Sequence, residues 1–169
     1  THCISSAASD VYKRQLMFLS RVRLLIATFW VGTLWAVGFV VAPTLFSTLS
    51  DRALAGTIAG SLFNTVAWLS LFCAAALLAL LFQAGRGAQA QPAKVNYYLI
   101  IGMVACTLIG YFALQPHMAE LRLVLHSVAD ADAAALAEVR KQFGILHAVS
   151  TGFYVVQSLL GAALILKLR

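Results

Sequence analysis

The side chains that could do chemistry gather near one end of the apolar segments of this chain. Gln115 and His117 flank a proline where one apolar segment ends, and His147 and Ser150 stand one helical turn apart where the next begins. Asn64 lies early in another segment. Polar groups inside apolar segments are costly unless they are partnered, so these five residues are candidates for binding a small molecule, a lipid or a metal. The alternative is that they cap helices or form hydrogen bonds between helices.

Two of these residues are histidines, which could ligate haem iron or copper if their helices are neighbours. His117 and His147 are therefore the candidate metal ligands. The chain has no CxxCH motif, so covalent attachment of haem is excluded. The sequence favours the absence of any cofactor and leaves haem or copper as the alternative.

His147 and Ser150 also belong to a longer periodic pattern. Alternating spacings of three and four connect Arg140, Phe143, His147, Ser150 and Tyr154, which predicts that all five share one helix face. A second set of polar residues lies deeper in the apolar segments: Ser70, Thr107 and Gln157.

Familiar catalytic motifs are missing from the sequence. It contains no Walker loop, no HExxH and no plausible Ser/His/Asp set. No carboxylate lies within an apolar segment, which argues against a proton-coupled transporter. Cys73 and Cys106 could offer soft ligands to Cu(I), but buried cysteine also acts as a small apolar residue, and we favour that reading. A non-enzymatic role is therefore favoured, namely binding of a small ligand or partner. A metal- or haem-handling redox protein is the alternative, and a small transporter is the third.

Four apolar segments must position these side chains. They cover roughly residues 22–42, 62–82, 97–114 and 145–166, and each is close to the ~20 residues that a helix needs to cross a ~30 Å hydrocarbon layer. Apolar residues make up 62% of the 169 residues and charged residues only 11%, against about a quarter in soluble domains. We therefore expect one all-α domain, an integral membrane four-helix bundle over residues 16–169.

The predicted helices run over about 20–42, 52–82, 96–115 and 132–167, with an extra amphipathic or extramembrane helical stretch between the last two. Pro43 is expected to end the first helix, since proline disfavours helix in the residue before it, and a short turn should follow over 44–49. Pro116 should disturb the end of the third helix. Ser50 or Asp51 is a good N-cap for the second helix, and Asp130 or Asp132 for the last.

The flanking charges predict an orientation. With four spans, one side carries both termini and the 83–96 loop; when residues 1–15 are left out of the count, it has six basic residues and no acid: Arg21, Arg23, Arg86, Lys94, Lys167 and Arg169. The other side carries five acidic residues and four basic ones, Arg52, Arg122, Arg140 and Lys141. Basic loops stay cytoplasmic, so both termini should be cytoplasmic, in the inner membrane of a bacterium. The lipid bilayer is the expected partner, and nucleic acid is not, because the basic residues form no stripe with interleaved aromatics.

Residues 5–15 resemble a translated transposase sequencing adapter, so residues 1–15 are expected to be an artefact and disordered.

Small residues at helical spacing predict close helix packing, and a homodimer is the alternative use of the same faces. These packing residues are Gly32, Gly56, Gly60, Ala148 and Gly152.

Three motifs together resemble the transmembrane protein 205-like family, a bacterial domain of unknown function. They are WVGTLW followed by APTLF over residues 30–46, AGTIAGSLF over 55–63 and FGILHAVS over 143–150. The resemblance covers essentially everything after residue 15 and implies a four-helix integral membrane protein. A more distant likeness is to copper-resistance D-type and protoporphyrinogen-oxidase-type membrane proteins, which carry a histidine before the first-helix tryptophan. This chain has Ala27, Thr28 and Phe29 there, which argues against a haem or copper role.

Overall fold

The computed structural model describes residues 2–86, 93–127 and 133–168. Within these ranges the chain is helical apart from short connections and contains no strand. Four helical rods are long and apolar enough to cross a membrane: Met17–Thr48, Arg52–Gly85, Lys94–Leu125 and Ala134–Leu168. The predicted all-α architecture with four membrane helices is therefore confirmed.

Two of the rods contain a π-helical segment, written η. In chain order the elements are α1 (His2–Trp35), η1 (Ala36–Val41), α2 (Ala42–Thr48), α3 (Arg52–Arg86), α4 (Lys94–Thr107), η2 (Leu108–Ala113), α5 (Leu114–Ser127) and α6 (Ala133–Leu168). α1 begins at His2, within the stretch that the sequence predicts to be an artefact. That residues 1–15 are foreign to the protein stays a prediction.

Pro43 and Pro116 lie inside the rods rather than at their ends. The predicted stop at Pro43 and the turn over 44–49 are wrong, because the first rod continues through α2 to Thr48. The third rod likewise continues past Pro116 and ends at Ser127, whereas the sequence predicts its end at residue 115. Proline lacks an N–H and its ring clashes with the carbonyl four residues earlier. Here that carbonyl belongs to η1 or η2, and the wider π turn relieves the clash without ending the helix.

The turn between α2 and α3 agrees with the predicted cap. Leu49 leaves the helix in an extended conformation, with φ −88° and ψ 124°. Oδ1 of Asp51 then accepts hydrogen bonds from the N–H groups of Ala53, at 2.8 Å, and Leu54, at 3.1 Å. Asp51 therefore satisfies two amide groups that the first turn of α3 leaves unpaired. The predicted caps of the last helix, Asp130 and Asp132, lie outside the described residues.

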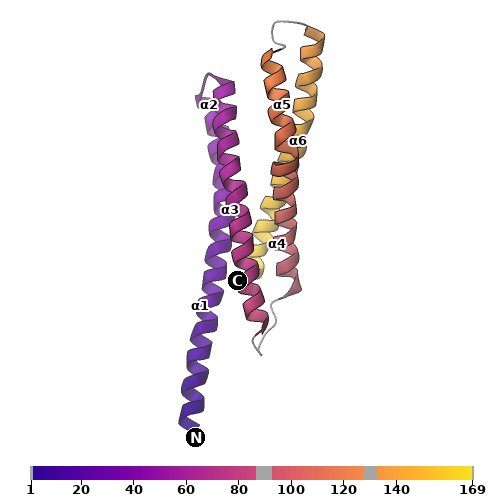
Figure 1. The fold of residues 1–169 in the computed structure, drawn as a ribbon. Helices are drawn as coiled ribbons and strands as arrows, with labels where there is room; N and C mark the ends of the chain where they lie inside the picture. The colour runs from indigo at the N-terminus through magenta and orange to yellow at the C-terminus, as the bar shows by residue number, and fades with distance from the viewer. Residues whose placement is uncertain (1, 87–92, 128–132, 169) are drawn as a thin grey trace.

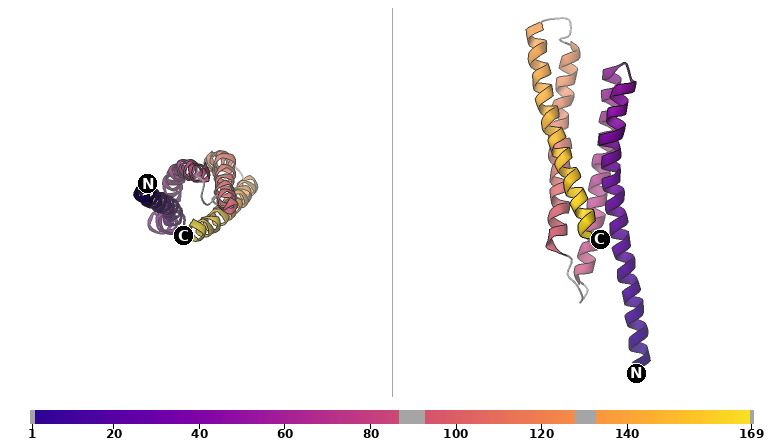
Figure 2. Two further views of the ribbon diagram at one scale, coloured as in Figure 1. Left: turned by 90° about the horizontal axis from the view of Figure 1, so that it is seen from below. Right: turned by 180° about the vertical axis from the view of Figure 1, so that it is seen from behind.

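The close-packed core fills only one half of the bundle. Its buried members come from the half where α4 begins and α6 ends: Ala27, Trp30, Val31, Leu34, Val66, Cys73, Ala74, Leu77, Leu81, Ile100, Met103 and Leu164. There α4 packs on α6 and α3, and α1 packs on α3 and α6. Toward the other end the rods separate into two arms, one of α2 and α3 and one of α5 and α6 (Figures 1 and 2). The outward faces are strongly apolar, with Leu25 and Phe72 exposed by 71% and 70%, as lipid contact requires.

Glycine permits close helix contact at positions other than those predicted. A Cβ on Gly161 would lie 2.7 Å from a methyl of Val31 and 3.2 Å from Cε of Met103, so α6 approaches α1 and α4 closely there. By contrast, Gly32 and Gly152 are exposed and face open space. Ala148 is exposed as well. These three do not pack the four rods together, and a homodimer through them stays a prediction. Gly56 and Gly60 face the other arm across a cavity.

Candidate functional site

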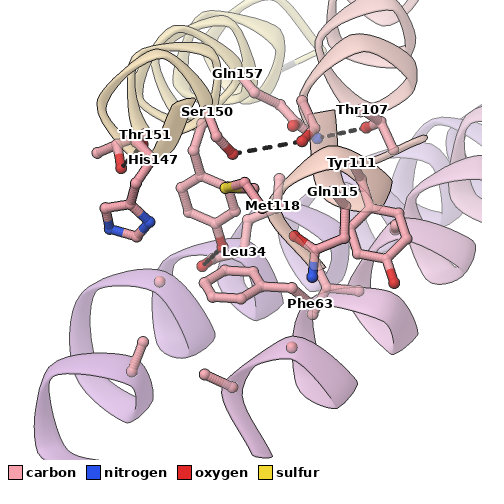
Figure 3. Close-up of a pocket in the computed structure, with 18 of the residues that line it drawn as sticks. Leu34, Phe63, Thr107, Tyr111, Gln115, Met118, His147, Ser150, Thr151 and Gln157 are labelled. Atoms are coloured by element: carbon pink, nitrogen blue, oxygen red, sulfur yellow. Dashed lines mark hydrogen bonds between the residues drawn. The ribbon is translucent and has the colours of Figure 1, made fainter. Parts of the chain in front are cut away.

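A cavity of about 400 Å³ lies between the two arms. Every rod contributes to its wall: η1 and α2 with α3 on one side, and η2 and α5 with α6 on the other. The cavity exists because the core residues stop at the half of the bundle where the rods are in contact. Figure 3 shows side chains of α5 and α6, including Gln115 and His147, directed toward the helices of the opposite arm.

Tyr154 forms the central part of the wall. Its hydroxyl donates a hydrogen bond to the carbonyl of Leu34, at 2.5 Å. Its ring meets Phe63 edge-on, with centroids 5.5 Å apart, and Phe39 in the same manner at 6.2 Å. These contacts tie α6 to the first rod and to α3, and they give the cavity an aromatic wall.

The floor carries the buried polar residues Ser70, Thr107 and Gln157. Trp30 Nε1 donates to Oγ of Ser70 at 2.9 Å, and that hydroxyl donates to the carbonyl of Val66 at 2.7 Å. This pair satisfies both polar side chains, as their low-dielectric surroundings demand.

The second floor contact leaves an acceptor free. Thr107 donates its hydroxyl proton to the carbonyl of Met103, at 3.1 Å, so its Oγ1 can only accept from Gln157. Nε2 of Gln157 supplies that hydrogen bond at 2.9 Å (Figure 3). Oε1 of Gln157 then has no partner among the described residues and is not an enclosed atom. The floor therefore offers one acceptor to a ligand or to water.

Arg122 marks the opposite end of the cavity, its mouth. Its Nη1 donates to the carbonyl of Gly56 at 3.2 Å, which bridges α5 and α3 across the opening. The guanidinium carbon also lies 5.9 Å from the ring centroid of Phe143, a cation–π contact. Phe143 in turn stacks with His147 at 6.1 Å and 11°. A cation is thus held at the rim of an apolar cavity by a carbonyl and an aromatic ring.

Two more rim residues are uncommitted. The side chains of Gln115 and His147 line the cavity, and neither forms a hydrogen bond with the described protein. Gln115 approaches Gly60, where a Cβ would lie 3.6 Å from its Nε2. Gln115 is half-buried and His147 is exposed, so both unpaired side chains are accessible to a ligand.

Ser150, another predicted site residue, also lines the cavity but is engaged. Its hydroxyl donates to the carbonyl of Gly110 in η2, at a long 3.4 Å. Tyr154, also on α6, donates to the carbonyl of Leu34, which lies just before η1 in the first rod. Thus α6 provides one hydroxyl donor to each of the two rods that contain a π segment. α6 therefore holds both irregular segments in place around the cavity.

The structure brings together three of the five predicted site residues, Gln115, His147 and Ser150, and separates the other two. Asn64 is exposed and absent from the cavity lining. His117 is also exposed, with Nδ1 3.1 Å from the carbonyl of Ala113 on its own helix. Helical phase explains the split, because only one face of each rod reaches the cavity. Phe63 of α3 and Gln115 of α5 lie on those faces. Asn64 comes one residue after Phe63 and His117 two residues after Gln115, so each lies on a different face of its helix.

The two candidate metal ligands therefore occupy different surroundings, one in the cavity wall and one outside it. Within the described residues no three His, Cys, Asp or Glu side chains form a group that could hold a metal ion. Haem or copper on His117 and His147 stays an untested prediction.

Arg122 is the rim residue that sequence reasoning assigned only to loop charge. In the sequence it is one of the four basic residues on the side opposite the termini. Its signal was its position: a single basic residue within the apolar sequence LRLVL, beyond a proline that does not end the helix.

These features define a class: a multi-pass helical membrane protein with an amphipathic cavity at one end of its bundle. Residues 25–127 match DUF4149, a domain of unknown function, and the chain belongs to that family. The match spans the first three rods, with the 30–46 and 55–63 motifs, and ends before α6. No protein of curated function and no solved structure matches the chain.

Proposed function

We propose that this protein binds a small amphiphilic molecule in the cavity between its two arms. One observation carries the proposal: an apolar, aromatic cavity has a rim of polar side chains that the protein leaves unsatisfied. Gln115 and His147 have no hydrogen-bond partner among the described residues, and Arg122 has one. A concave apolar site with a few convergent polar groups is the usual form of a small-molecule site.

Binding is favoured over catalysis by the bonding of the rim hydroxyls. Ser150 donates to Gly110 and Thr151 to the carbonyl of His147, so neither is hydrogen-bonded to the imidazole as an activated nucleophile would be. No carboxylate lies among the lining residues that the structure describes.

The test is to fill the cavity from one small residue. Gly60→Leu should place its side chain in the cavity beside Gln115 and lower the affinity for a neutral, environment-sensitive apolar dye. Gly152→Leu is the matched control, because Gly152 faces open space. We expect saturable one-to-one binding by the wild type and the control and at least a tenfold loss in Gly60→Leu. Equal affinity of all three proteins, with equal thermal stability, would exclude this cavity as the binding site.

The proposal includes an orientation in the inner membrane of a bacterium, with both termini in the cytoplasm. The support is the charge asymmetry: basic residues without acids flank the end that carries the termini. The cavity then opens toward the outer leaflet, and α5 with the start of α6 extends beyond the membrane there. We also propose, from the three sequence motifs, that the chain is related to the transmembrane protein 205-like family.

Single cysteines in a cysteine-free background test the orientation. Ser50→Cys places a thiol in the turn between α2 and α3, and Arg86→Cys places one at the end of α3. An impermeant maleimide should label position 50 in intact spheroplasts and position 86 only after lysis. The reverse pattern would overturn the orientation while leaving the cavity proposal intact.

A further inference from the structure

Arg122 is under-satisfied for a half-buried cation. A guanidinium has five N–H donors, and the structure gives this one a single hydrogen bond, to the carbonyl of Gly56. Its other contact is the face of the Phe143 ring. It has no carboxylate partner within the described part of the chain. A cation next to apolar surface is stabilised strongly by an anion, because the local dielectric is low.

The acids that the structure describes near this end of the bundle are hydrogen-bonded elsewhere or exposed. Asp51 caps α3, and Glu138 accepts a hydrogen bond from Gln142. Glu120 is exposed, and none of the three lines the cavity. The charge of the described lining is therefore positive, with Arg122 as its permanent cation.

The rest of the rim suits an oxyanion. The carboxamide of Gln115 can donate through its Nε2, and His147 can donate from its ring. Arg122 and His147 are both placed by the same ring, Phe143, one as a cation–π partner and one as a stacking partner. Charge-assisted hydrogen bonds of this kind are roughly twice as strong as neutral ones.

The cavity extends along the bundle, because its lining follows the third rod from Thr107 to Arg122. The α-helical rise of 1.5 Å per residue gives an upper limit of about 22 Å between Thr107 at the floor and Arg122 at the mouth, since η2 lies between them. A volume of about 400 Å³ is near the small end of the usual range for ligand pockets, about 300–1,000 Å³. Spread over that length, it admits one hydrocarbon chain more readily than two.

We propose that the cavity takes a single-chain anionic amphiphile, with its carboxylate or phosphate on Arg122 and its chain along Tyr154 and Phe63. This rests on the proposed function and adds the class of ligand. The mouth supplies the charge and hydrogen bonds, and the aromatic wall supplies the apolar surface. The chemistry shared by the two headgroups is an oxyanion on one alkyl chain.

Competition in a neutral detergent tests the headgroup. Purified protein carrying the neutral dye is titrated with dodecanoate, dodecyl phosphate, dodecanol and inorganic phosphate. The two anionic amphiphiles should displace the dye at concentrations at least tenfold below that of dodecanol, as one or two charge-assisted hydrogen bonds predict. Inorganic phosphate should not displace it. The two anionic arms show whether a carboxylate or a phosphate is preferred.

Arg122→Gln removes the charge and should bring dodecanoate and dodecyl phosphate to the affinity of dodecanol. Arg122→Lys should retain part of the preference. Arg140→Gln is the matched control, since Arg140 is an exposed arginine of α6 outside the cavity lining, and it should behave as wild type. Dodecanol binding by Arg122→Gln shows that the cavity of that variant is intact.

The outcomes separate this inference from the proposed function. Equal competition by dodecanol and the anionic amphiphiles in the wild type overturns the anionic class and leaves amphiphile binding standing. A preference that survives Arg122→Gln overturns the role of Arg122. Displacement by inorganic phosphate as effective as by dodecyl phosphate overturns the need for a chain. If no amphiphile displaces the dye, the proposed function fails as well.

Discussion

Tyr154 of α6 inserts its ring beside Gly38 of η1 and donates its hydroxyl to the carbonyl of Leu34. A π segment disturbs the regular hydrogen bonding of a helix, and here it coincides with a position that has no side chain. The tyrosine uses that space, and in doing so it joins the first and last rods of the bundle at the border between core and cavity.

Substitution of Gly38 by alanine should therefore be destabilising. The new Cβ would overlap Cε1 of Tyr154, so the ring or the helix must move. Overpacking of this kind costs about 1–3 kcal/mol, measurable as a lower unfolding midpoint in detergent. Gly32→Ala on the same rod meets nothing within 4 Å and should be neutral or slightly stabilising. An equal effect of the two variants would contradict the close contact seen here.

The hydroxyl of Tyr154 can be tested separately from its ring. Tyr154→Phe keeps the edge-on contacts with Phe63 and Phe39 but removes the hydrogen bond to Leu34. Hydrogen bonds inside membrane proteins average about 0.6 kcal/mol and reach about 1.7 kcal/mol, so a modest loss of stability is expected. Tyr98→Phe is the control, because Tyr98 is 71% exposed. A loss no larger than that of the control would mean that the bond contributes nothing.

The cap of α3 should contribute in the same range. Asp51→Ala removes the acceptor of two amide groups and should cost about 1 kcal/mol of unfolding free energy, whereas Asp51→Asn should cost much less. Thermal unfolding of both variants measures the difference. Similar losses for alanine and asparagine would indicate that the charge of Asp51 matters rather than its capping bonds.

The four rods were predictable from sequence, because lipid imposes long apolar runs whatever the tertiary contacts are. The ends of the rods were not. Pro43 and Pro116 were read as helix breakers by a rule that describes helices in water. In this bundle each proline follows a π segment, and the freedom to form one depends on contacts from α6 that are remote in sequence.

The site was predictable in part for a similar reason. The 3-4 spacing of α6 correctly placed His147, Ser150 and Tyr154 on one face, and that face lines the cavity. Asn64 and His117 were chosen by depth alone, without a helical phase to test them. Arg122 required knowing that α5 continues past Pro116 and that α3 presents Gly56 to it.

Two native cysteines offer a last test of the cavity itself. Cys106 lines it, whereas Cys73 lies in the core, although their exposed fractions are almost equal, 9% and 7%. In a Cys3→Ser background, Cys73→Ser leaves Cys106 as the single thiol, and Cys106→Ser leaves Cys73. A small apolar maleimide should label Cys106 faster, because Cys73 becomes accessible only through local opening of the core.

An occupant should change only one of those two rates. If an amphiphile fills the cavity, saturating dodecanol should slow the labelling of Cys106 and leave that of Cys73 unaffected. The experiment reports on occupancy without relying on the dye. Equal labelling rates for the two thiols would argue that the space between the arms is closed in the membrane protein, and protection of both would point to a general effect of the alcohol on the bundle.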